Sequence, residues 1–209
     1  ELCRMYSPTR TNEPVLAKQH GERALQMYGA LGNAGGEAQA RWCLTDVLRS
    51  GNNEERSEAK RHAEAALSIV DRLGYAYGLG RAYNYLALVA WAGRNGTDAG
   101  ALWEKALTLT EQVGNALLGS RILMNLGVVN ELLGQRARAF KYYRDSLAMF
   151  EAAGHEQDAA WNQANAASIV IRFGDNPDQG LRDAQNALAV FEKLGDKDFE
   201  VFARLTIAT

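Results

Sequence analysis

The 209-residue chain has little proline, cysteine or histidine, and neither sign of charge is in strong excess. Its three prolines, Pro8, Pro14 and Pro177, favour a mostly helical chain, because proline breaks the interior of a helix. The formal net charge of −2 provides no long-range attraction to nucleic acid or to an anionic membrane. No apolar run approaches the roughly 18 residues of a membrane span, and no signal peptide opens the chain. We therefore expect a cytoplasmic protein without direct nucleic-acid or membrane partners.

The few cysteines and histidines do not form a recognisable reactive site. Cys3 and Cys43 lack the spacing of a metal site; a disulfide between them stays open, but we expect two reduced thiols. His20, His62 and His155 have no second ligand at a spacing such as His-Glu-x-x-His. Neither a Gly-x-Ser-x-Gly elbow nor a Gly-x4-Gly-Lys-Ser/Thr loop is present. The sequence therefore predicts no catalytic residue, no metal and no cofactor, and we interpret the chain as a protein that is not an enzyme.

What the chain does have is a pattern repeated at intervals of 40 to 42 residues. A small residue followed by leucine marks each copy: Ala24-Leu25, Ala66-Leu67, Ala106-Leu107, Ser146-Leu147 and Ala187-Leu188. Seven residues before each pair lies another small residue: Ala17, Ala59, Ala99, Ala139 and Gly180. A fixed period of this length, kept in register five times, indicates an array of repeated structural units.

Glycine closes each copy of the pattern. The closing residues are Gly32, Gly74, Gly114, Gly154 and Gly195, and a second series, Gly51, Gly93, Gly134 and Gly174, falls about midway between them. Glycine after the last periodic residue ends a helix, because it accepts the left-handed backbone that other residues resist. We therefore expect two helices and two turns per copy. Pro14 and Pro177 are expected to start helices, and Thr97 to cap one.

These residues resemble the tetratricopeptide repeat. That family has a small residue on the first helix of each unit, two small residues seven apart on the second helix, and an aromatic residue between those two. The matching first-helix residues are Ala87, Gly127 and Ala167, and the matching aromatic residues are Trp103 and Tyr143. The period of about 40 residues exceeds the 34 usual for the family. The Leu-x-Asn-Leu-Gly core ending at Gly127 is similar to longer repeats of bacterial signalling ATPases and transcriptional regulators.

The resemblance implies an all-α fold, a right-handed superhelical array of antiparallel helix hairpins, in a single domain over residues 1–209. The expected parts are residues 13–32, the second helix of a truncated repeat, then the full repeats 36–74, 77–114, 116–154 and 156–195, and finally 198–209, the start of a further repeat. We expect the chain to be a fragment of a longer protein.

In such an array the first helices line the inner, concave face, which is the expected binding surface. Counting from the small first-helix residues gives the candidates Trp42, Arg81, Asn84, Tyr85, Leu88, Trp91, Arg121, Met124, Asn125, Trp161, Asn165 and Ser168. Asparagine hydrogen-bonds a peptide backbone, arginine binds a carboxylate, and tryptophan supplies contact area. Two structural alternatives stay open: the tryptophans belong to the core between repeats, and Asn125 and Asn165 fix an adjacent turn.

We interpret the chain as a non-catalytic protein- or peptide-binding scaffold, the interaction or sensor segment of a larger bacterial regulatory protein. Arg81, Asn84 and Arg121 are expected to form the polar centre of the inner face. One alternative is a sensor of a small ligand or signal peptide, with a closed pocket between Trp91 and Trp161. A second alternative is self-assembly, in which the ends of the array form a homo-oligomer.

Overall fold

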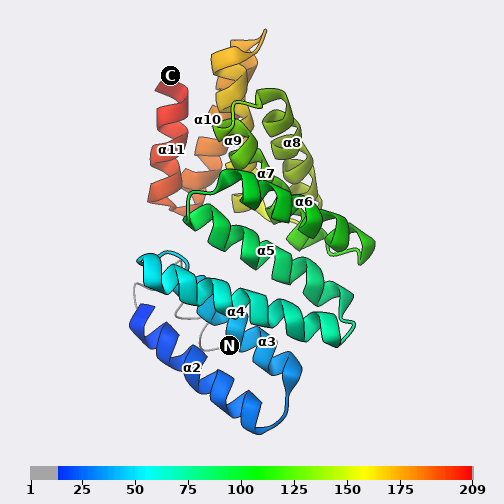
Figure 1. Ribbon diagram of the computed structural model, residues 1–209. Helices are drawn as coiled ribbons and strands as arrows, with labels where there is room; N and C mark the ends of the chain where they lie inside the picture. The colour runs from blue at the N-terminus through cyan, green and yellow to red at the C-terminus, as the bar shows by residue number, and fades with distance from the viewer. Residues whose placement is uncertain (1–13, 209) are drawn as a thin grey trace. The chain divides into compact units, whose positions relative to one another are not determined.

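The computed structural model describes residues 14–208, and all regular structure within this range is α-helix (Figure 1). The chain divides into two compact units, Glu1–Gly114 and Asn115–Thr209, which we describe separately. The predicted all-α array of helix hairpins is confirmed in both units. The predictions for residues 1–13, including Cys3, lie outside the described residues.

The described part of unit 1, residues 14–114, contains five helices joined by short turns. They are α2 (Pro14–Ala30), α3 (Ala34–Leu48), α4 (Asn53–Arg72), α5 (Ala76–Ala92) and α6 (Gly96–Gln112). Each helix packs against the next one along the chain, and α3 also contacts α5. The direct contact between α3 and α5 brings the first helices of two successive hairpins together, as an inner face requires.

Unit 2 repeats this arrangement with five further helices. They are α7 (Ala116–Leu132), α8 (Arg136–Ala152), α9 (Glu156–Phe173), α10 (Pro177–Leu194) and α11 (Lys197–Ala208). Successive helices again pack on one another, and α9 contacts α11 directly. The last helix, α11, therefore lies beside α9 in the way that α5 lies beside α3.

Left-handed residues end most of the helices, as the glycine pattern predicts. Positive φ angles between 61° and 73° occur at Gly32, Gly74, Gly114, Gly134, Gly154 and Gly195. In the turn between α5 and α6 the left-handed residue is Arg94, with φ 61°, and not Gly93. Arg94 occupies the place that Gly134 takes one repeat later. An arginine here therefore adopts the left-handed conformation, which is unfavourable for residues other than glycine.

Asparagine side chains cap the start of five of the ten helices within residues 14–208. Asn33, Asn52, Asn95, Asn115 and Asn176 each accept a hydrogen bond from a backbone N–H in the first turn of the helix that follows. Such caps stabilise a helix by about 1 kcal/mol each. The prediction that Thr97 caps a helix is wrong, because α6 already starts at Gly96 and Asn95 accepts from the Asp98 N–H. Pro177 starts α10, as predicted, while the prediction for Pro14 falls at the edge of the described residues.

Small residues allow the two helices of a hairpin to approach each other. All five residues of the Ala17 series are buried, and so are Ala66, Ala106, Ser146 and Ala187 of the marker pairs. On the first helix of unit 2, a Cβ added to Gly127 would lie 2.4 Å from the ring of Tyr143, which is itself fully buried. Gly127 is therefore a position at which the two helices of a hairpin come into close contact.

Cys43 of α3 is disulfide-bonded, so the prediction of a reduced thiol is wrong at this position. The prediction rested on an expected reducing compartment, and spacing along the sequence carries no information on which distant sulfur atoms meet in space.

Candidate functional site

Three of the predicted inner-face residues meet in unit 1, and we call them the Arg81 stack: Trp42 from α3 with Arg81 and Tyr85 from α5. The rings of Trp42 and Tyr85 are stacked, with centroids 6.1 Å apart and planes 9° from parallel. The Arg81 Cζ lies 4.7 Å from the Trp42 ring centroid and 5.9 Å from that of Tyr85. A guanidinium over aromatic faces at these distances is a cation–π contact.

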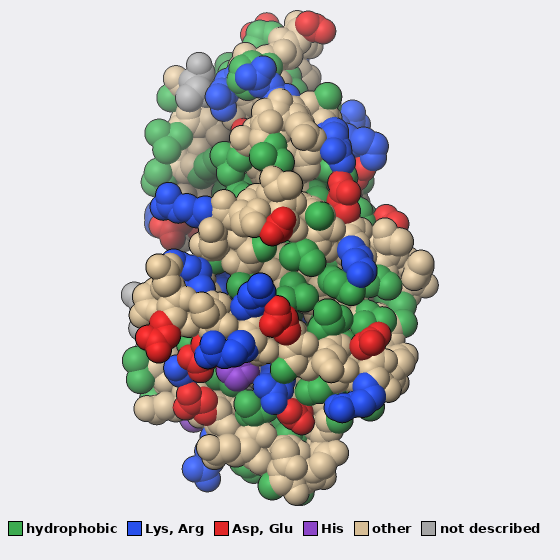
Figure 2. All heavy atoms as spheres, in the orientation of Figure 1, with side chains coloured by type: hydrophobic (Ala, Val, Ile, Leu, Met, Phe, Trp, Pro, Cys, Tyr) green, Lys and Arg blue, Asp and Glu red, His purple; other side chains and the backbone are tan. Residues whose placement is uncertain are grey.

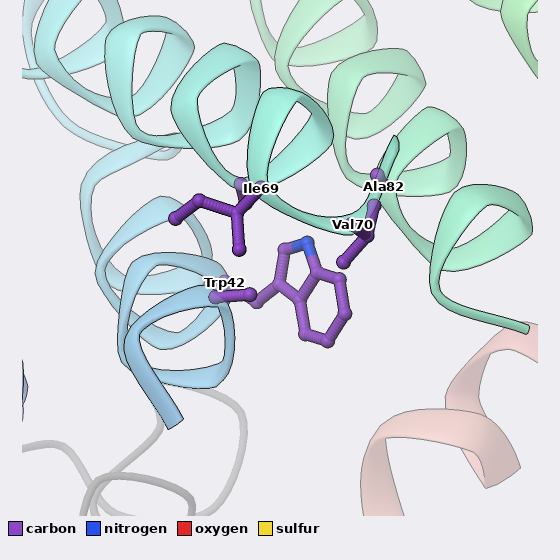
Figure 3. Packing of buried hydrophobic residues seen from close by; sticks show 6 residues of the cluster. Trp42, Ile69, Val70 and Ala82 are labelled. Carbon is purple, nitrogen blue, oxygen red and sulfur yellow. The ribbon is translucent and has the colours of Figure 1, made fainter. Parts of the chain in front are cut away.

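The helix period explains why the stack forms. Arg81 and Tyr85 are four residues apart on α5 and therefore share one face of that helix. Trp42 is only 3% exposed and packs against Ile69 and Val70 of α4 and Ala82 of α5, as Figure 3 shows. The indole is thus a rigid base that belongs to the core and carries the other two side chains. Its Nε1 is buried and has no hydrogen-bond partner among residues 14–208.

Arg81 is the uncompensated cation of this surface. Arg41 and Arg49 on α3 are each paired within their own helix, Arg41 with Glu37 at 2.7 Å and Arg49 with Asp46 at 2.8 Å. No carboxylate in the described part of the chain forms an ion pair with Arg81, which is half-buried. Its contacts are with aromatic rings, and the N–H groups that bind carboxylates lie at the edges of a guanidinium.

Asn84 makes a hydrogen bond within the hairpin. Its Oδ1 accepts from the Nε1 of buried Trp103 at 3.0 Å, which links α5 to α6. Trp91 is also engaged, with its ring 6.2 Å from that of Trp103 at an angle of 52°. Leu88 lies between these residues on α5 and is half-buried. The structure therefore brings Arg81 together with Trp42 and Tyr85, while Asn84 and Trp91 contact Trp103.

The candidates of unit 2 fall into a packed group on α9 and a less packed group on α7. Trp161 lies 4.7 Å from Phe199 and 4.5 Å from Phe202, ring centroid to centroid, so α11 covers part of its surface. Asn165 is buried, and its Nδ2 donates to the carbonyl oxygen of Trp161 at 2.7 Å. The less packed group has exposed Arg121, with half-buried Met124 and Asn125 beside it on α7, and Ser168 on α9 is half-buried as well.

The closed pocket expected between Trp91 and Trp161 stays a prediction. Trp91 belongs to unit 1 and Trp161 to unit 2. The same holds for a polar centre that includes both Arg81 and Arg121.

Two features of unit 2 were not predicted from the sequence. The first is a contact of the buried Tyr143 hydroxyl, which donates to Glu131 Oε2 at 3.1 Å. Burial, together with the Glu131 carboxylate, raises the pKa of Tyr143 well above its ordinary value. The second is a hollow of about 270 Å³ between α8, α9 and α10. No sequence signal marks the hollow, because its walls come from helices separated by a whole repeat.

Carboxylates lie closer to the histidines than the sequence suggested. His62 Nε2 is 3.8 Å from Glu58, and His155 Nδ1 is 3.7 Å from Asp158. Even so, residues 14–208 contain no group of three histidine, cysteine or acidic side chains placed to hold a metal ion. None of the described helices is both long enough and apolar enough to cross a membrane. On the face drawn in Figure 2, basic and acidic side chains are interspersed, in line with the small net charge.

Residues 78–152, which run from α5 to α8, match the family model described as Tetratricopeptide repeat. This stretch of the chain is therefore similar to the tetratricopeptide repeat. In these repeats Ala87 and Gly127 are the small first-helix residues, and Trp103 and Tyr143 are the aromatic residues, as predicted from the resemblance. A search of curated protein sequences finds no match to the chain.

Solved structures share the fold of these repeats at low sequence identity. BtubC from P. vanneervenii superposes with a TM-score of 0.78 at 18% identity, covering 91% of this chain and 80% of BtubC. A Rap protein complexed with competence and sporulation factor has a TM-score of 0.71 at 11% identity, covering 99% of this chain and 60% of that one. A STAND signal transduction ATPase with a tetratricopeptide repeat sensor, from Pyrococcus horikoshii, has a TM-score of 0.71 at 14% identity. There the match covers 99% of this chain and 35% of the ATPase.

Proposed function

We propose that this chain is a non-catalytic scaffold that binds a protein or peptide on the inner face of its helix hairpins. The observation that carries the proposal is the Arg81 stack, in which a cation without an ion-pair partner is held over two aromatic rings. Tryptophan, tyrosine and arginine are the residues that contribute most to binding energy at protein interfaces. A buried tryptophan beneath an arginine and a tyrosine is such a centre.

The stack is suited to a carboxylate of the partner, from an acidic side chain or a chain end. Because the rings hold the guanidinium in place, less side-chain entropy is lost when a ligand binds. The N–H groups at the guanidinium edge then donate two parallel hydrogen bonds to the two carboxylate oxygens. Tyr85 adds contact area beside this pair.

The solved structures support this kind of role by analogy of fold. One of them is a Rap protein in complex with competence and sporulation factor, and another uses its repeats as a sensor. We therefore propose that the chain is a cytoplasmic interaction or sensor segment of a larger bacterial regulator. As part of this proposal, residues 1–209 are one repeat domain that does not bind nucleic acid or membranes.

Selection from a displayed random-peptide library tests the proposal. We expect wild-type protein to enrich acidic peptides, and Arg81→Ala to bind them about tenfold or more weakly, the loss typical of an important interface arginine. Arg121→Ala tests whether α7 contributes to the same peptide. Arg61→Ala, an exposed arginine on α4, is the matched control and should leave affinity unchanged. Enrichment of peptides without acidic residues would contradict the proposal. So would an Arg81→Ala protein that is partly unfolded but whose folded fraction binds the peptides normally.

Self-association through the array ends stays a prediction. It is favoured by Val201 and Leu205, which lie four residues apart on α11 and are 58% and 62% exposed. Apolar side chains exposed on one helix face are typical of protein contacts. Light scattering at increasing concentration tests it, and a monomeric mass throughout would remove this alternative.

A further inference from the structure

The hollow of unit 2 is lined by none of the predicted inner-face residues. Its lining includes two small side chains, Ala159 and Ala160 of α9, and two larger apolar ones, Leu147 of α8 and Val190 of α10. The two alanines are nearly fully buried. Because alanine side chains are small, these two positions leave more space in the hollow than larger residues would.

The size of the hollow limits what it holds. Its volume of about 270 Å³ is below the range of roughly 300 to 1,000 Å³ typical of pockets for drug-sized ligands. A single long side chain from another molecule matches this volume better than a cofactor does. The apolar walls favour a ligand with an aliphatic stem.

Acidic groups dominate the rim. Glu151 of α8 and Glu156 of α9 both line the hollow, together with the Gln163 amide and the His155 imidazole, whose Nδ1 lies 3.7 Å from Asp158. Glu156 is bound by Lys193 at 2.8 Å and 3.1 Å, whereas Glu151 has no ion-pair partner within residues 14–208. Lys193 therefore pairs with one of the two lining glutamates and not with the other. The remaining negative charge favours a cation at the rim.

We propose that this hollow binds a lysine side chain of a partner protein. The four methylene groups would lie over Ala159 and Ala160 between Leu147 and Val190, and the ammonium group would reach the Glu151 carboxylate. Long basic side chains bury their stems against apolar surface while the charged end stays at the rim. The site differs in place and in charge from the Arg81 stack, which belongs to unit 1, so either proposal can fail without the other.

Methyl NMR on the whole chain tests the proposal, with Ala159 and Ala160 as the reporters. The probe is Nα-acetyl-lysine methylamide, and the uncharged probe of similar length is Nα-acetyl-norleucine methylamide. We expect saturable shifts of both methyl groups with the lysine probe, at a dissociation constant on the order of 1 to 10 mM. Glu151→Gln should weaken this binding by about fivefold, near the upper range for an exposed ion pair. Glu111→Gln, at the equivalent place on α6, is the matched control and should change nothing.

Three results would overturn the proposal. The first is that neither alanine methyl group shifts over the same concentration range, and the second is that the norleucine probe binds as tightly as the lysine probe. The third is unchanged affinity of Glu151→Gln for the lysine probe. Glu151 is exposed, so the melting temperature of this variant should match that of the wild type and a folding defect would not hide the result. A third probe, free cadaverine, identifies the source: if it binds better than the capped lysine, the ligand is a small amine and not a partner's side chain, which would also overturn the proposal.

Discussion

The Nε1 of Trp103 donates a hydrogen bond to Asn84 Oδ1 at 3.0 Å, which ties the second helix of a hairpin to the first. Trp103 is only 1% exposed, so this N–H has no access to water as a substitute partner. The same asparagine had been assigned to the ligand surface by counting along the helix. Its position is thus determined in part by the core.

Replacing Asn84 by alanine should therefore destabilise the protein without any ligand present. We expect the free energy of unfolding to fall by about 1 to 3 kcal/mol, because a buried donor loses its acceptor. Urea denaturation of the wild type and the variant measures this change. In a Trp103→Phe background, which lacks the donor, the same substitution should cost clearly less, and equal costs in the two backgrounds would contradict the role of this bond.

A second prediction concerns the left-handed residue of the α5–α6 turn. Arg94 has a φ of 61°, while Gly134 has a φ of 73° at the equivalent place one repeat later. We expect Arg94→Gly to raise the free energy of unfolding by about 0.5 to 1 kcal/mol, because it removes the strain of a side chain in this region. Gly134→Ala should lower the free energy by about 1 kcal/mol. Thermal unfolding of both variants checks the pair, and changes of the same sign would contradict the argument.

The third prediction contrasts two glycines inside helices. A Cβ on Gly127 would lie 2.4 Å from the Tyr143 ring, whereas a Cβ on Gly29 of α2 would meet nothing within 4 Å. We expect Gly127→Ala to lower the free energy of unfolding by about 1 to 2 kcal/mol, because overpacking outweighs the gain in helix propensity. Gly29→Ala should raise it by about 0.5 to 1 kcal/mol. Denaturant midpoints measured side by side decide whether close approach of the helices explains the glycine at 127.

The fourth prediction concerns His62, which is half-buried on α4. Burial is the main cause that lowers the pKa of His62 below its ordinary value of 6.5, with a smaller contribution from the Arg41 charge, and nearby Glu58 opposes the shift. The unfolded chain therefore binds a proton more readily than the folded one. Stability from this group is fully present above about pH 6.5 and is lost as the pH falls through the folded pKa.

Denaturation at a series of pH values measures this effect. Between pH 8 and pH 5 the wild type should lose more free energy of unfolding than His62→Gln, which does not titrate. An NMR titration of the His62 ring should give a midpoint below 6.5 in the folded protein. A midpoint above that value would reverse the sign of the prediction.

The features readable from the sequence are those that depend on neighbouring helices alone. The spacing of Ala59, Ala99 and Ala139 predicts the hairpins, because each repeat packs mainly on the next and needs a small residue at the same contact. Helix ends follow from local backbone preferences, as the left-handed Gly154 shows. Thr97 was assigned as a cap in error, because the turn was expected to extend to Gly96, whereas Asn95 caps the helix and Gly96 is already its first residue.

The candidate site was readable only in part. Helix periodicity placed Arg81 and Tyr85 on one face, and the structure adds that buried Trp42 lies beneath them. Periodicity could not show that Trp161 is packed against Phe199 and Phe202, because those contacts come from a helix that starts some 35 residues later in the chain.

The amino-acid sequence by itself determined the class of fold and the repeat, because both follow from a local residue pattern that recurs in every repeat. Only the tertiary structure decided which polar groups already have partners within the protein and which do not. Asn84 accepts a hydrogen bond from Trp103, while Arg81 forms no ion pair with a carboxylate in the described chain. It also decided where space remains, as between Ala160 and Val190. Hydrogen bonding and packing of this kind depend on which side chains meet across helices, and that is a property of three-dimensional distance and not of spacing along the chain.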